Sequence, residues 1–110
     1  STIAIPSRTS RAGIDVTDWY AVGGGESAFI AFDPNNPELI YAGSYQGNIS
    51  VFDQKTKDAK DIMAYPSIGL AITPSTMKYR FNWNAPIVAQ PQNPKIIYHG
   101  ANKVLRTADE

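Results

Sequence analysis

Apolar residues in this chain come in short runs that alternate with polar residues, and turns rich in glycine, proline and asparagine separate the runs. Such a pattern is typical of β-strands rather than helices. It predicts short strands at residues 2–6, 15–22, 27–32, 39–44, 49–53, 60–65, 83–90, 96–100 and 103–107. Residues 27–32 are small and apolar, so we expect an inner strand buried on both faces. The more polar 60–65 suit an edge strand.

The frame P-x-N-P-x-x-I-Y-x-G occurs twice, at residues 34–43 and again 57 residues later at 91–100. Each copy follows an apolar run and precedes an alternating one, which indicates one strand–turn–strand unit used twice. The turn of the first copy is expected at 33–37, where two prolines restrict φ and the asparagines tolerate left-handed backbone. Residues 66–77 lack a clear period and are expected to form a loop, in which Pro74 limits any helix.

Four short antiparallel strands within about 40 residues are the content of one β-propeller blade. The predicted fold class is therefore all-β, with antiparallel four-stranded blades of a β-propeller, about two of which are present. The expected organisation is the outer strands of one blade at 1–25, a complete blade at 26–65, an inter-blade loop at 66–82 and an incomplete next blade at 83–110.

Closure of such a fold sets an expectation about partners. Propellers close with about four to eight blades, so we expect this chain to be a piece of a longer protein and to pack against the remaining blades. Assembly of several copies into a ring is one alternative. An open sheet with association-prone edges is the other.

Charge and composition exclude several classes of function. Ten Lys and Arg residues balance ten Asp and Glu residues without forming blocks, which argues against a nucleic-acid groove. The chain has no cysteine, so disulfides and thiolate metal sites are excluded. No apolar run approaches the roughly 20 residues of a membrane span. Glycines 23–25 lack the lysine and the helix of a phosphate-binding loop, and no cofactor or metal is predicted.

Several segments together resemble one known family. They are RFNWNAPI at 80–87, NPKIIYHG at 93–100, LRTAD at 105–109 and WYAVGGGES at 19–27. These segments resemble the BNR-repeat, or Asp-box, β-propellers, which include sortilin-like proteins and bacterial proteins described as glycosyl hydrolases. In that family a strand ends in S/T-x-D-x-G-x-T-W, and Thr107, Ala108 and Asp109 have the form of its opening, whereas residues 53–56 depart from it. The resemblance implies a propeller fold and an exported bacterial protein.

Blade geometry predicts which loops share a face. The links into the inner strands and the turns between second and third strands open on the face where propellers usually bind ligands, and here these are 23–27, 45–48, 80–84 and 100–102. The expected ligand-binding residues on them are Glu26, Tyr45, Gln46, Arg80, Asn82, Trp83 and Asn84.

Aromatic rings beside an arginine and amides suit a carbohydrate or protein ligand, and the leading hypothesis is a binding or scaffold segment. The alternative is structural: Trp83 caps the core between blades, and Asn82 and Asn84 satisfy turn backbone.

The competing hypothesis is a glycoside hydrolase of sialidase or xyloglucanase type. Glycoside hydrolysis uses two carboxyl groups about 5–9.5 Å apart, and only Glu26 falls on the favoured face. Glu26 or His99 would act as acid–base, and the second carboxylate would lie outside this segment. A sialidase-like site would instead need clustered arginines and a tyrosine nucleophile, for which the sequence supplies Arg8, Arg11, Arg80 and Tyr45. For His99, the single histidine, the alternative is a structural or surface role.

Overall fold

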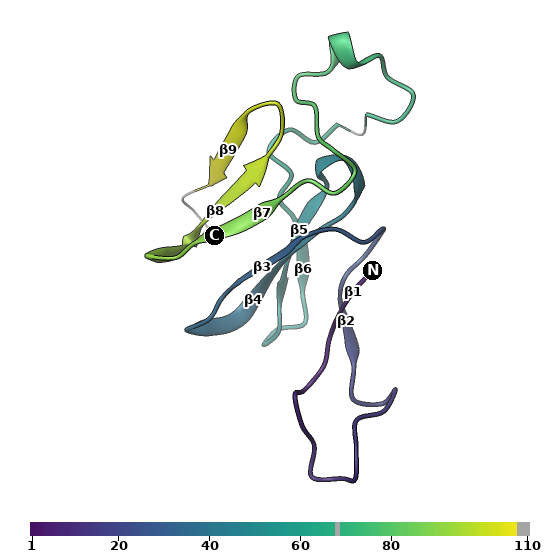
Figure 1. Ribbon diagram of the computed structural model, residues 1–110, viewed down its shortest axis with the longest axis vertical. Helices are drawn as coiled ribbons and strands as arrows, with labels where there is room; N and C mark the ends of the chain where they lie inside the picture. Colours follow the sequence, from purple (N-terminus) through teal and green to yellow (C-terminus); the bar gives the residue numbers. More distant parts are fainter. Residues whose placement is uncertain (68, 108–110) are drawn as a thin grey trace.

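The computed structural model describes residues 1–67 and 69–107, and this part of the chain is all-β (Figure 1). Its strands are β1 (Thr2–Ala4), β2 (Tyr20–Gly23), β3 (Ile30–Asp33), β4 (Asn36–Gly43), β5 (Ile49–Asp53), β6 (Ala59–Asp61), β7 (Ile87–Gln90), β8 (Asn93–Gly100) and β9 (Val104–Thr107). Two short 3-10 turns are also present, η1 (Tyr45–Gly47) and η2 (Pro74–Thr76). Neither of these described helical turns is long and apolar enough to cross a membrane. The prediction of an all-β fold is confirmed.

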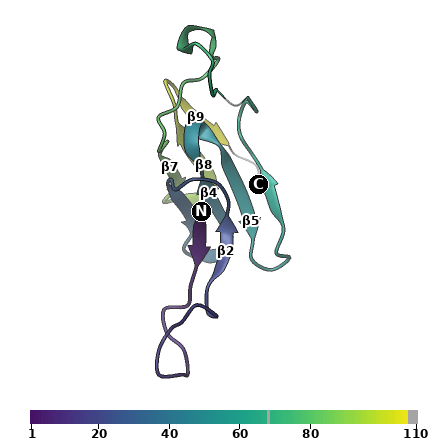
Figure 2. The ribbon, with the colours of Figure 1, turned by 90° about the vertical axis from the view of Figure 1, so that its right-hand side faces the viewer.

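The strands form three antiparallel sheets that lie side by side. β1 and β2 make a two-stranded sheet, β3-β4-β5-β6 a four-stranded sheet and β7-β8-β9 a three-stranded sheet, each in sequence order. The four-stranded sheet lies between the other two, as Figures 1 and 2 show from two directions. β2 packs against β4 and β5, whereas β7 and β8 pack against β3. The predicted antiparallel arrangement is therefore confirmed, and the described sheets do not close on themselves.

Alternation along β4 holds the three sheets together. Ile40 faces the two-stranded sheet, where it packs with Val22. The next residue, Tyr41, faces the three-stranded sheet and packs with Ile87 and Ile97. Because successive side chains of a strand point to opposite faces, one apolar dipeptide serves two interfaces at once.

The two copies of the sequence repeat make equivalent hydrogen bonds. The N–H of Gly43 donates to the carbonyl of Phe29, and the N–H of Gly100, 57 residues later, donates to the carbonyl of Pro86, both at 2.9 Å. The frame ends in glycine because the chain before the first strand of each unit passes very close to it. A Cβ atom would lie 3.1 Å from the Ala28 Cβ at the first glycine and 2.6 Å from the Pro86 Cγ at the second.

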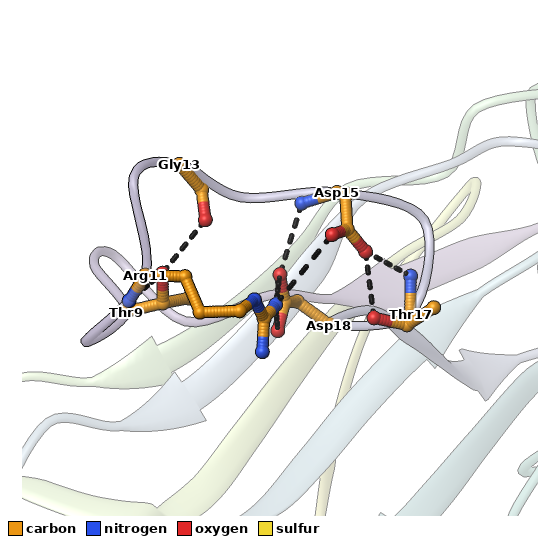
Figure 3. Close-up of polar contacts among 6 residues, drawn as sticks. All are labelled: Thr9, Arg11, Gly13, Asp15, Thr17 and Asp18. Carbon is orange, nitrogen blue, oxygen red and sulfur yellow. Dashed lines mark hydrogen bonds and ion pairs between the residues drawn. The ribbon is translucent and has the colours of Figure 1, made fainter.

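The long connection between β1 and β2 corrects the prediction of a strand at 15–22, because these residues join the sheet only from the start of β2. Local polar contacts hold the connection in turns (Figure 3). Asp15 accepts hydrogen bonds from the hydroxyl and the N–H of Thr17 at 2.6 and 2.8 Å. Asp18 accepts the N–H of Asp15 at 2.9 Å and a bond from Arg11. These bonds hold the pKa of both carboxyl groups below the usual range.

The turn of the first repeat is shorter than predicted. It comprises two residues, 34–35, instead of 33–37, because strand pairing resumes at Asn36. Asp33 closes the turn by accepting the N–H of Asn35 at 2.8 Å, as aspartates before tight turns commonly do. Pro34 is therefore the first residue of the turn, and Pro37 already belongs to β4.

Several other strands are also shorter than predicted, among them β1, which ends at Ala4 instead of 6, and β3, which starts at Ile30 instead of 27. For β6 and β7 the reason is that a strand pairs only as far as its partner runs. β6 stops at Asp61 instead of reaching 65, and the N–H of Ile62 makes the last bond, to the carbonyl of Ile49 at 3.0 Å, where β5 begins. β7 starts at Ile87 instead of 83, close to where its partner β8 ends.

The expectation that β3 is buried on both faces is wrong for the described chain. Ala31, which faces the three-stranded sheet, is buried. Ile30 and Phe32 point to the opposite side and are 48% and 51% exposed. The reason is geometric: the two-stranded sheet packs against β4 and β5, and a cavity separates β1 from Ile30 and Phe32.

Truncation of Ile97 tests the interface between the four- and three-stranded sheets. Ile97 is 2% exposed, so Ile97→Ala should lower the free energy of unfolding by about 2–5 kcal/mol through lost burial and a residual cavity. Val16→Ala, at a side chain 70% exposed, is the control and should change it by less than about 0.5 kcal/mol. Urea unfolding measures both, and equal midpoint shifts would contradict this packing.

Candidate functional site

Four loops meet at one end of the sheets. The 23–27 loop reaches the start of η1 through the N–H of Glu26, which donates to the Ser44 hydroxyl at 3.0 Å. The 80–84 and 100–102 loops are joined by two hydrogen bonds. The N–H of Arg80 donates to the Asn102 Oδ1 at 2.9 Å, and the N–H of Asn102 donates to the Arg80 carbonyl at 2.8 Å. These contacts bring together residues that are distant in sequence.

Phe81 locks the 80–84 loop against η1. Gly47 has φ +83°, and a Cβ atom there would overlap the Phe81 ring. The centroids of the Phe81 and His99 rings lie 4.9 Å apart. Glycine at 47 is therefore required both by the left-handed backbone and by the ring that covers it.

An aromatic pair joins η1 to the 80–84 loop, with Trp83 exposed and Tyr45 half-buried. The rings of Tyr45 and Trp83 lie 5.4 Å apart, centroid to centroid, with 30° between their planes. Trp83 is 52% exposed, so it does not cap a core in the described chain. Asn82 and Asn84 flank it and are also exposed. The geometry leaves an aromatic surface open to a ligand, with amide groups beside it.

Gln46 and Arg80 face a different feature, a cavity of about 440 Å³ beside η1. The structure adds Tyr65, Lys78 and Tyr79 to the residues around them, and sequence reasoning missed all three. The signal available in the sequence was the density of aromatic and basic residues at 78–81 within a loop otherwise lacking pattern.

The two candidate acid–base residues do not share one environment. Glu26 is exposed on the 23–27 loop. His99 is buried, 7% exposed, on the face of the three-stranded sheet that packs against the four-stranded one. Among the described residues that line its cavity, Arg106 is charged and no carboxylate is present to orient the imidazole. This placement favours the structural role for His99.

Burial dominates the electrostatics of His99. Its Nε2 has no hydrogen-bond partner among the described residues. Removal from water disfavours the charged imidazolium and lowers the pKa of His99 below its usual value. The histidine is therefore neutral at physiological pH.

The arginines proposed for a sialidase-like site do not all gather here. Arg11 is engaged by Asp15 and Asp18 in the β1–β2 connection, whose segment lies at the far end of the molecule from the 66–82 loop in Figure 1. Within the described ranges, no group of three or more His, Cys, Asp or Glu residues is arranged to hold a metal ion. Ala108 and Asp109 of the expected Asp-box lie outside the described residues.

No family model, curated protein or solved structure matches this chain.

The buried histidine predicts a pH dependence of stability. The unfolded imidazole titrates near 6.5 and the folded one at a lower pH, so the unfolded chain binds more protons below about pH 6.5. The free energy of unfolding should therefore fall as pH drops below that value. His99→Ala, which installs the residue that the first repeat has at position 42, should flatten this dependence.

The urea midpoints of the wild type and of His99→Ala, measured between pH 5 and 8, test this effect. This pH range lies above the ordinary pKa values of carboxyl groups. The same fall in stability in wild type and His99→Ala would contradict it.

Proposed function

We propose that this chain is a segment of a BNR-type β-propeller that acts as a binding module for carbohydrate. The observation that carries the binding proposal is the Tyr45–Trp83 pair on loops from two different sheets, in which Trp83 is exposed and Tyr45 is half-buried beneath it in the contact. The resemblance to BNR propellers supports the architecture, and it also suggests that the protein is exported.

A comparison of the two repeats supports a propeller beyond the three-stranded sheet, at one end of the stack of three sheets. Tyr98 in the second repeat corresponds to Tyr41 in the first, which is buried by the neighbouring sheet. On the face that carries Tyr98, Val88 is 54% and Val104 75% exposed. In the first repeat, Ala31 holds the position of Val88 in the strand pairing and Ile49 holds that of Val104, and both are buried. The repeat thus predicts a further sheet over this face.

The other side of the stack supports the same architecture. The two-stranded sheet has the position expected for the outer strands of a blade, since it covers β4 and β5. Ile30 and Phe32 of β3 are uncovered where the inner strands of that blade would lie. Both uncovered surfaces are apolar, as surfaces between blades are.

The chemistry of the exposed pair favours a sugar as ligand. The C–H face of a pyranose is apolar and packs on an aromatic ring, while its hydroxyl groups need donors and acceptors at the rim. Trp83 provides the ring, and the amides of Asn82 and Asn84 lie next to it in the chain. Trp and Tyr are also frequent anchors of protein interfaces, so a protein ligand is the other outcome of the test.

The enzyme alternative receives less support from the geometry. It needs a carboxyl pair, and the described residues place Glu26 on an exposed loop and His99 in the core without an orienting carboxylate. Binding requires only groups that the described loops already present.

Removal of the Trp83 ring tests the proposed function. Trp83→Ala should weaken binding to a responsive glycan at least about tenfold, because the stacking surface is lost. Tyr45→Ala should weaken it less, since Tyr45 is half-buried and presents less ring surface than Trp83. A glycan array identifies the ligand, and isothermal titration calorimetry measures the affinities.

The chain offers a matched control in its second tryptophan. Trp19 is 43% exposed in the distant β1–β2 connection, and Trp19→Ala should leave affinity unchanged. Equal loss of affinity in both tryptophan variants would overturn the assignment, as would glycan binding that survives Trp83→Ala.

A further inference from the structure

The cavity beside η1 lies between that turn and the segment that leads from β6 toward β7. In Figure 1 this segment projects beyond the sheets as a large green loop. The cavity walls are mainly apolar and aromatic, with Met63, Tyr65, Ile72, Met77, Tyr79 and Phe81 among them. Its volume of about 440 Å³ falls within the range of roughly 300–1,000 Å³ that is typical of small-molecule sites.

The charged side chains of the described residues that line the cavity are all basic. Lys78 and Arg80 line it, and its described lining contains no carboxylate. Neither cation forms an ion pair with another residue of the described ranges. The Lys78 ammonium instead lies 4.5 Å from the ring centroid of Tyr65 and 5.8 Å from that of Tyr79. Such cation–π contacts orient the ammonium without neutralising it.

The two tyrosines also shape the apolar part of the cavity. Their ring centroids lie 6.4 Å apart and their planes are nearly perpendicular, at 82°. A flat ring that packs against one tyrosine therefore meets the other edge-on, an arrangement that aromatic groups favour.

Gln46 supplies an unused hydrogen-bond acceptor in the same lining. Its backbone has φ +54°, a left-handed conformation uncommon for residues other than glycine. Its side-chain Oε1 is buried without a hydrogen-bond partner among the described residues. Buried acceptors are nearly always hydrogen-bonded, and strained backbone positions cluster at ligand sites. A donor on a bound molecule would complete this position.

We propose that this cavity binds a small organic anion with an aromatic body. The carboxylate pairs with Lys78 and Arg80, the ring packs against Tyr65 and its neighbours, and an O–H or N–H group donates to the Gln46 Oε1. The inference goes beyond carbohydrate binding, because it uses neither ring of the Tyr45–Trp83 pair and rests on a different set of contacts.

The probe that tests the proposal is 4-hydroxyphenylacetate, which carries a ring, a carboxylate and an O–H donor. Its neutral counterpart is 4-hydroxyphenylacetamide, of nearly the same shape. Titration of the labelled chain, followed by amide chemical shifts, should give a dissociation constant about tenfold lower for the acid than for the amide. The shifts should centre on η1 and residues 77–81.

Three variants assign the binding groups. Lys78→Met keeps the aliphatic stem and removes the charge, and Arg80→Gln leaves the backbone bonds to Asn102 intact; each should weaken the acid about tenfold and leave the amide unchanged. Gln46→Leu should weaken both probes, because both donate to Oε1. Lys55→Met, at an exposed lysine in the β5–β6 turn, is the charge control and should bind as wild type does.

The outcomes separate this inference from the carbohydrate proposal. Trp83→Ala should bind the acid as wild type does, whatever its effect on glycans. The inference is overturned if the acid and the amide bind equally, if Lys78→Met and Arg80→Gln bind the acid as wild type does, or if neither probe shifts the lining residues at millimolar concentration. Far-UV circular dichroism of each variant establishes that it is folded.

Discussion

The structure depends on the alternation of apolar side chains along β4. Ile40 and Tyr41 are neighbours in sequence but serve different sheets, so every strand placement around them is constrained by two interfaces at once. A slip of one residue in β4 would exchange the two faces and lose both clusters. The same constraint recurs in β8, where Ile97 faces inward and Tyr98 faces away from the described sheets.

Much of the sheet architecture could be predicted from the sequence because the same strand–turn–strand pattern occurs twice in it. The frame predicted two strand–turn–strand units, and β3–β4 and β7–β8 are those units. Strand ends were less predictable, since they depend on where a partner stops, as at the end of β6. Residues 15–19 alternate like a strand, yet local bonds made by Asp15 and Asp18 override the pattern.

The candidate site was predictable in part. Sequence spacing assigned Tyr45 and Trp83 to one surface, and the structure brings their rings together. It could not separate them from Gln46 and Arg80, which turn toward a neighbouring cavity. That division arises from the path of the 66–82 loop, whose residues carry no periodic signal. The burial of His99 matches that of Ala42, its counterpart in the first repeat, but the sequence alone did not show that Ala42 is buried.

We propose that the uncovered apolar faces at both ends of the stack are packing surfaces for further sheets of the same kind. Light scattering coupled to size exclusion, across a range of concentrations, would detect association through these faces. We expect this chain to self-associate, so that its mass exceeds that of the monomer. Val88→Lys with Val104→Lys should lower the mass, because charges on the open face of the three-stranded sheet oppose packing. A wild-type chain that stays monomeric at every concentration, or a variant of unchanged mass, would contradict it.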